Sequence, residues 1–154
     1  MRRFFHGLAF ASCFLWAIHT EAGTGRVMKV LPHFLDLQGR HTLHPSLYER
    51  DAYQAVLREH PEKRSGIRFD VEWRSRGAVW EPLTLRVELR GIAKGNVPKE
   101  LVIEKQVKPE SWFGQWTSFP VIGKEYQSIG DVTGWRVTLW EGQQSLGELQ
   151  SFLW

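Results

Sequence analysis

The stretch "HFLDLQGRHTLH" contains four side chains of types that bind metal ions, namely His33, Asp36, His41 and His44. Two imidazoles three residues apart could ligate zinc from a turn, with Asp36 or His33 as a third ligand. Off a helix, however, that spacing does not aim both rings at one point, and His44 precedes Pro45, which restricts its backbone. We therefore predict no metal site and no cofactor, with His41 and His44 as the weak candidates for metal ligands.

Common catalytic motifs are missing from the chain. It contains no G-x-S-x-G elbow, no H-E-x-x-H pair and no glycine-rich phosphate loop. A glycosidase needs only two carboxylates in a cleft. Glu72 and Glu88, however, alternate with arginines on strand faces, and Asp51 and Glu59 belong to the polar side of an expected helix. We predict no catalytic residues, and a small hydrolase or metal-binding protein is the last of three hypotheses.

Tryptophan is the most informative component. The chain has eight tryptophans, of which only Trp16 lies in the first 22 residues. A buried indole removes on the order of 200 Å² from water, which accounts for Trp73 and Trp135, both in phase with aliphatic neighbours. The stretch "SWFGQWTSF" instead follows Pro109 and contains Gly114, so part of it is expected on a loop or edge. The candidate ligand-binding residues are Trp112, Phe113, Trp116 and Trp140.

Trp140 has two interpretations. In "GWRVTLWEG", a two-residue period places Trp135, Val137 and Leu139 on one face and Trp140 on the other. Either a ligand or another element of the fold must cover this second indole. Because large uncovered apolar patches are uncommon on monomers, we expect the predicted helix to cover Trp140.

Most of the chain alternates apolar and polar residues with a period of two. "IRFDVEWR" and "LTLRVELR" each place four apolar residues on one face, which predicts antiparallel strands with one face in water. We expect "GIAKGNVPKE" to be a flexible loop and Gly147 to mark a bulge that returns Leu146 and Leu149 to the interior. Five further strands are predicted at 27–37, 101–107, 117–122, 134–140 and 146–153.

One segment has helical spacing instead. Ser46 and Glu49 form a capping-box pattern, apolar residues follow at helical spacing, and Pro61 ends the pattern. We predict a helix over about 47–60, inserted after the first strand. Its expected apolar face consists of Leu47, Tyr48, Ala52, Ala55 and Val56.

The closing hairpin "GWRVTLWEGQQSLGELQSF" resembles the last two strands of bacterial immunoglobulin-like domains. Seven positions carry the resemblance: Gly134, Trp135, Val137, Leu139, Gly142, Leu146 and Phe152. It implies an accessory, adhesive or partner-binding domain, and it brings no catalytic residues. The predicted fold is thus a mainly β, antiparallel, immunoglobulin-like two-sheet sandwich with one inserted α-helix. The predicted helix and the missing cysteine pair depart from the standard domain.

The first 22 residues have the pattern of a cleaved secretory signal peptide. Arg2 and Arg3 precede an apolar run, and Thr20 and Ala22 are small residues at the positions that a signal peptidase inspects. A lipid anchor on Cys13, the only cysteine, is the less favoured alternative. We predict residues 23–154 to be one secreted or periplasmic domain without a membrane span.

Charge and composition exclude some partners. The net charge is only +3, and basic residues occur singly among acidic ones, which argues against a nucleic-acid partner. We predict an exported, non-catalytic binding or structural module of the cell envelope with a protein partner. Polysaccharide binding through the Trp112–Trp116 stretch is the second hypothesis.

Overall fold

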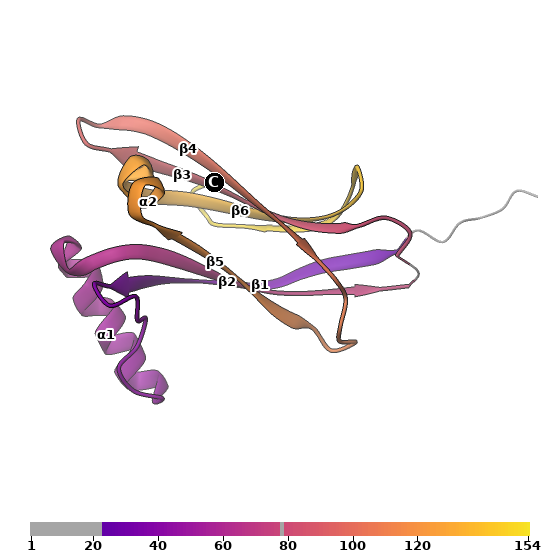
Figure 1. Ribbon diagram of the computed structural model, residues 1–154, viewed down its shortest axis with the longest axis horizontal. Coiled ribbons are helices and arrows are strands. Elements are labelled where there is room, and N and C mark those ends of the chain that lie inside the picture. Colours follow the sequence, from indigo (N-terminus) through magenta and orange to yellow (C-terminus); the bar gives the residue numbers. More distant parts are fainter. Residues whose placement is uncertain (1–22, 78) are drawn as a thin grey trace, which may run out of the picture.

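The computed structural model describes residues 23–77 and 79–154, and it consists mainly of two antiparallel sheets stacked face to face (Figure 1). The smaller sheet has the strand order β1-β2-β5. These strands are β1 (Thr24–Asp36), β2 (Arg64–Arg76) and β5 (Gln115–Ile122). The predicted mainly β, two-sheet architecture is confirmed.

The larger sheet has the strand order β4-β3-β6-β7. Its strands are β3 (Leu83–Ala93), β4 (Val97–Val107), β6 (Asp131–Glu141) and β7 (Gln144–Gln150). β3 pairs with β4 through a short turn in which Gly95 and Asn96 have positive φ, a conformation that these two residue types tolerate. The expectation of a flexible loop over "GIAKGNVPKE" is wrong, because most of that stretch extends the two strands of this hairpin.

The core lies between the sheets and is built from the predicted alternation. In β2 the inward residues include Phe69, Val71 and Trp73, all fully buried, and β3 contributes four leucine and valine side chains in the same phase. The indole N–H of Trp73 donates a hydrogen bond of 2.9 Å to the Thr117 hydroxyl, which satisfies the only polar group of this buried ring. The two-residue period therefore predicted the inner faces correctly.

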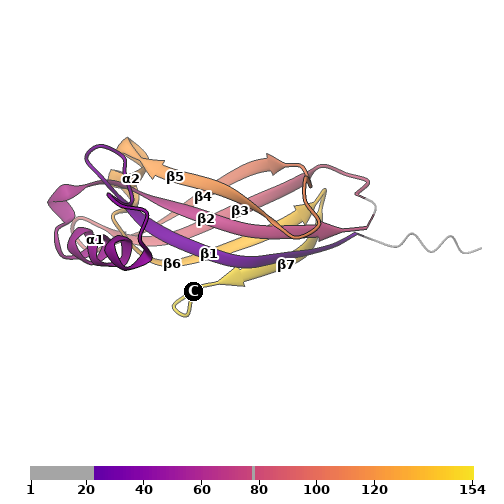
Figure 2. The same ribbon diagram turned by 90° about the horizontal axis from the view of Figure 1, so that it is seen from below.

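One lateral side of the sandwich is closed where β1 runs beside β7 (Figure 2). A Cβ atom at Gly25 would lie 2.7 Å from that of Leu146, and one at Gly147 would lie 2.9 Å from the Gly25 carbonyl oxygen. The pairing of β6 with β7 shifts register beside Leu146, and both Leu146 and Leu149 pack against the core. The predicted bulge is confirmed, and the two glycines allow the close approach of β1 and β7.

The helix α1 (Leu47–Glu59) follows β1, as predicted, but it packs with a different face. Its buried residues are Gln54 and Leu57, whereas Tyr48 is 83% exposed and Leu47 and Val56 are also exposed. Ser46 is the N-cap residue, yet its side chain makes no capping hydrogen bond, so the predicted capping box does not form. The predicted apolar face is therefore wrong.

Hydrogen bonds explain why α1 docks in this orientation. The Gln54 side-chain amide accepts from the Phe34 backbone N–H at 2.8 Å and donates to the carbonyl oxygens of Phe34, at 3.0 Å, and His41, at 2.7 Å. These three bonds satisfy backbone groups at the end of β1 and in the following loop. These bonds determine which side of α1 faces the sheet, because burying Ala52 and Ala55 of the predicted face would contribute less than satisfying these backbone groups.

Two shorter helices complete the end of the sandwich at which α1 lies (Figure 1). The 3₁₀ turn η1 (Pro61–Lys63) leads into β2, and α2 (Gly123–Ile129) connects β5 to β6. Ile129 is 1% exposed and belongs to the core, and Tyr126 packs against it. Sequence patterns gave no indication of α2. In the described part of the chain, no helix has both the length and the apolar character that a membrane crossing requires.

Candidate functional site

The aromatic candidates separate into two groups on opposite sheets. Trp112 and Phe113 lie on the loop between β4 and β5, and Trp116 lies on the outer face of β5, opposite Glu72 of β2. Trp140 lies on the outer face of the four-stranded sheet, paired with Thr84 of β3. The four residues therefore do not form one site.

Trp140 is not covered by the helix, contrary to our expectation, because α1 packs on β1 and η1, in the other half of the sandwich. The guanidinium of Arg86 lies 5.5 Å from the centre of the indole ring. Thr84, Glu104 and Gln143 line a shallow hollow of about 350 Å³ with these two side chains. The buried Nε1 of Trp140 has no hydrogen-bond partner among the described residues.

We define the aromatic loop as residues 108–114, between β4 and β5, which expose two large rings. The exposed fraction is 77% for Trp112 and 92% for Phe113, and Trp116, just beyond the loop, is 51% exposed. Gln115 holds the loop in shape, because its amide accepts from the Glu110 N–H at 2.7 Å and donates to the Lys108 carbonyl at 2.6 Å. The rings are thus presented to solvent by a braced loop, which lowers the entropy cost of binding.

The histidines proposed as metal ligands do not gather as a set. His44 is exposed, and its Nδ1 atom lies 3.8 Å from a carboxylate oxygen of Glu49. The ring of His41 instead stacks at a tilt near that of His33, with 5.2 Å between the ring centroids. Within residues 23–77 and 79–154, no group of three or more His, Cys, Asp or Glu side chains is placed to hold a metal ion.

Asp36 serves the loop that follows β1 instead of a metal ion. Its buried carboxylate accepts hydrogen bonds from the backbone N–H groups of Gln38 and Arg40, the guanidinium of Arg40 and the hydroxyl of Tyr53, at 2.7–2.9 Å. Burial alone would raise the pKa of Asp36, but these donors hold the pKa of this carboxyl below its ordinary value. The group therefore ties the loop to α1.

Asp70 is the centre of a second polar network, on the outer face of the three-stranded sheet. It accepts hydrogen bonds from Arg68 at 2.7 Å and from the Ser118 hydroxyl at 2.6 Å, and the Nε2 atom of His33 lies 3.7 Å away. Burial opposes ionisation, but the donors Arg68 and Ser118 hold the pKa of Asp70 below its usual range. Burial lowers the pKa of His33 and favours the neutral imidazole.

This network does not have the geometry of an activated serine. An activated nucleophile needs its hydroxyl against a base that a third group orients. Here the Ser118 hydroxyl donates to the Asp70 carboxylate, and that carboxylate, not the serine, is the group beside His33. The network compensates buried charge with hydrogen bonds, which is the expected arrangement of a structural polar cluster.

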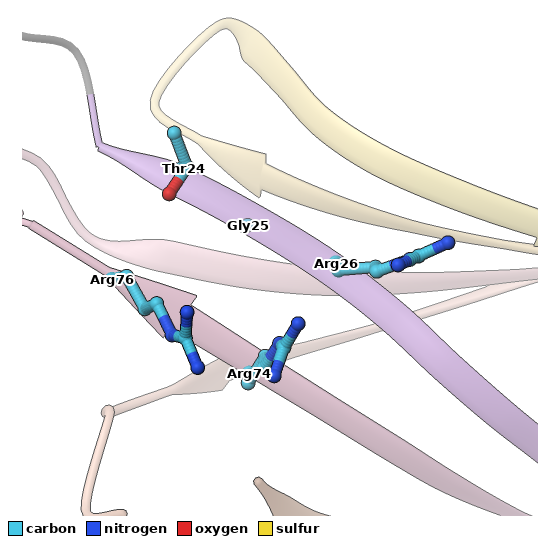
Figure 3. A pocket seen from close by; sticks show the side chains of 5 residues that line it. All are labelled: Thr24, Gly25, Arg26, Arg74 and Arg76. Carbon is cyan, nitrogen blue, oxygen red and sulfur yellow. The ribbon is translucent and has the colours of Figure 1, made fainter. Parts of the chain in front are cut away.

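A group of arginines lies near the start of β1, at positions that no sequence pattern singled out. Arg26, Arg74 and Arg76, with Thr24 and Gly25, line a hollow of about 210 Å³ (Figure 3). Charge patterning along the chain could not reveal this hollow, because about fifty residues separate Arg26 from the other two. Only the pairing of β1 with β2 brings the three side chains to one face.

Comparison with family models, with curated proteins and with solved structures found no match for this chain.

Proposed function

We propose that this protein is an exported, non-catalytic binding module of the cell envelope, and that the aromatic loop contacts a protein partner. The observation that carries this proposal is the exposure of Trp112 and Phe113 on a loop that Gln115 holds in place. Solvent exposure of two such rings gains nothing for folding, because neither ring is removed from water. A partner that covered them would gain that apolar burial.

The residue types around the loop favour a protein partner. Protein interfaces are enriched in tryptophan, phenylalanine and arginine, and a few such residues carry most of the binding energy. A hollow of about 280 Å³ beside the loop is lined by Trp112, Arg76 and Ser75, among others. An aromatic ring, a guanidinium and a hydroxyl therefore lie next to one another there, a mixture that suits a peptide surface.

We propose further that the sandwich is immunoglobulin-like. Constant-type immunoglobulin domains have seven strands in two sheets, of four and three, with connections that cross between the sheets. Here the connections β2–β3 and β5–β6 cross as the second-to-third and fifth-to-sixth connections of that domain do. The fourth strand, however, pairs with β3, so β4–β5 replaces β3–β4 as the third crossing, and the four-stranded sheet is the one that contains β3, β6 and β7. This strand order supports the resemblance that the closing hairpin suggested.

Export is proposed from the sequence alone. The leader of residues 1–22, including Cys13, lies outside the described residues. We propose that the leader is cleaved and that the mature chain is secreted or periplasmic, with the lipid anchor on Cys13 as the alternative. Mass spectrometry of the N-terminus after expression in a bacterial host distinguishes the two.

The test is affinity capture from the envelope of the source organism with a matched set of baits. The first variant combines Trp112→Ala and Phe113→Ala, and the control combines Leu47→Ala and Tyr48→Ala, which also removes two exposed apolar side chains, but from α1. We expect a protein retained by wild type and control and lost by the loop variant. With the purified partner, the loop variant should raise Kd by about thirtyfold or more, because interface anchors contribute about 2 kcal/mol or more.

A partner that binds all three baits equally would contradict the role of the loop. Unfolding curves in urea show whether the loop variant keeps its fold, and we expect a change in stability within about 0.5 kcal/mol, as for most surface substitutions.

Carbohydrate binding is the second candidate function, because Trp112 and Trp116 lie on neighbouring exposed segments and aromatic faces can stack on sugar rings. A soluble glycan that binds there would protect tryptophan fluorescence from quenching by acrylamide. Unchanged quenching across a panel of envelope glycans would remove this candidate.

A further inference from the structure

The arginine pocket, defined as the hollow lined by Thr24, Gly25, Arg26, Arg74 and Arg76, lies where β1 begins and β2 ends. Figure 3 shows the side chains of Arg74 and Arg76 side by side along β2, whereas that of Arg26 extends along β1. Thr24 lies on β1, on the side of Arg76. Four side chains that can donate hydrogen bonds therefore line one small hollow.

The pairing register places like charges against each other in this pocket. Arg26 is the direct cross-strand partner of Arg74, and Thr24 is the partner of Arg76. None of the ion pairs formed within the described part of the chain involves these three arginines. Like charges directly opposite each other destabilise a sheet, and no ion pair among the described residues offsets this cost, although Glu110 lines the adjoining hollow with Arg76.

The same sheet face shows what balanced charges look like. Arg68 binds Asp70 at 2.7 Å, and the cross-strand partner of Glu72 is Lys29, so both carboxylates on this stretch of β2 have a basic neighbour. Beyond Glu72 the strand carries only arginines on this face. On this face of β2, the arginines without an ion-pair partner therefore lie at the end of the strand, around the arginine pocket.

We propose that the arginine pocket binds a phosphate group. Guanidinium groups donate paired hydrogen bonds to phosphate oxygens, and the Thr24 hydroxyl can donate one more. A phosphate presents more acceptor oxygens to several guanidinium groups than a carboxylate does, and near neutral pH it carries one negative charge as a diester and about two as a monoester, so both forms suit a cluster of arginines. The volume, about 210 Å³, is below the range of roughly 300–1,000 Å³ for whole organic ligands, so the pocket fits a small anionic group.

The phosphate can belong to a small soluble molecule or to a lipid headgroup. Arg76 also lines the hollow beside Trp112, so the arginine pocket adjoins the aromatic loop. Arginines next to exposed aromatic rings suit the surface of an anionic bilayer as well as a free phosphate. This inference does not depend on which partner the aromatic loop binds.

The experiment uses protein produced by export, so that its natural N-terminus is retained. Inorganic phosphate is titrated against ¹⁵N-labelled protein, with sodium chloride of equal ionic strength as the reference. We expect saturable shifts at Thr24–Arg26 and Arg74–Arg76. A variant with Arg74→Gln and Arg76→Gln should weaken phosphate binding by about thirtyfold or more. A control with Arg58→Gln and Lys94→Gln removes the same charge from exposed positions elsewhere and should bind as wild type does.

A second arm identifies the source of the phosphate. Phosphatidylglycerol vesicles are compared with phosphatidylcholine vesicles in a sedimentation assay with the same three proteins. Retention on phosphatidylglycerol that the arginine variant loses and the control keeps assigns the site to a lipid headgroup. Binding of inorganic phosphate without retention on vesicles assigns it to a soluble phosphate.

The proposal is overturned if neither phosphate nor phosphatidylglycerol binds beyond the chloride reference. It is also overturned if the control variant loses as much binding as the arginine variant, because that result would indicate net charge alone. Neither result would affect the aromatic loop, whose test uses other variants.

Discussion

Two of the connections that cross between the sheets treat their apolar residues in opposite ways. The connection from β5 to β6 folds into α2 and buries Ile129 almost completely between the sheets, whereas the connection from β4 to β5 exposes Trp112 and Phe113. The first closes one end of the sandwich, and the second leaves apolar rings in water although Gln115 holds its backbone in place. The comparison shows that Gln115 holds the aromatic loop in place although its rings are not used for packing, as the proposed binding role requires.

The largest expected effect on stability comes from the connection between β5 and β6, which buries its apolar residue. Ile129→Ala should lower the free energy of unfolding by about 3 kcal/mol, because it removes apolar contacts and leaves a cavity beneath α2. Phe113→Ala, which deletes a larger but exposed side chain, should change it by less than about 0.5 kcal/mol. Urea unfolding followed by fluorescence measures both. Equal effects would show that the aromatic loop packs in solution.

A smaller effect distinguishes paired from unpaired arginines. Arg136 donates to both carboxylate oxygens of Glu88, at 2.7 and 3.0 Å, and these bonds hold the pKa of Glu88 below its usual value. Arg136→Gln should therefore cost about 1 kcal/mol. Arg74→Gln should instead raise stability slightly, by at most about 0.5 kcal/mol, because it relieves repulsion from Arg26.

The salt dependence of the Arg74→Gln effect tests whether repulsion between Arg74 and Arg26 causes it. The gain from Arg74→Gln should shrink as salt screens the repulsion and should disappear in phosphate if the anion occupies the arginine pocket. A loss of stability in low-salt chloride would mean that Arg74 has a stabilising partner.

The smallest effect is a dependence of stability on pH at the end that α1 and α2 close. Burial lowers the pKa of His33 in the folded protein, with opposition from Asp70 and support from His41, Arg50 and Arg68. Below the ordinary value of 6.5, the unfolded chain takes up this proton before the folded chain does. Stability should therefore fall as the pH is lowered from about 7 through the depressed pKa of His33.

Unfolding curves between pH 7.5 and 5 measure this decline. His33→Gln should make the decline shallower, and the slope that remains is expected from His41, whose pKa burial also lowers. A further decline is expected below 3.8, the ordinary value for aspartate, as Asp36 and Asp70 are protonated and lose their hydrogen bonds. A flat profile from pH 7.5 to 5 in the wild type would contradict the burial of neutral His33.

Much of the fold could be predicted from the sequence because the signals are local. The alternation in β2 and β3 placed Phe69, Trp73 and their neighbours inside, and the irregular spacing around Gly147 predicted the bulge at Leu146. The orientation of α1 could not be predicted in this way. It depends on hydrogen bonds from Gln54 to backbone groups of β1 and the following loop, which a hydrophobicity pattern does not detect.

The candidate site shows the same division. The position of Trp112 and Phe113 between Pro109 and Gly114 predicted that part of this stretch lies on a loop or edge, but only the structure shows that both rings are exposed. Trp140 was misjudged because the sequence shows that two faces exist but not which element covers each one. Its partner is Arg86, on the neighbouring strand, and not α1.

The sequence by itself determined which residues face the core, because side-chain alternation is a property of each strand alone. It also indicated that part of the stretch from Trp112 to Phe119 lies on a loop or edge, because Pro109 precedes this stretch and Gly114 lies within it. Only the tertiary structure decided what lies next to what across the sheets. Cross-strand register depends on all the packing contacts together. It placed Arg26 opposite Arg74, Ser118 opposite Asp70 and Trp140 opposite Thr84.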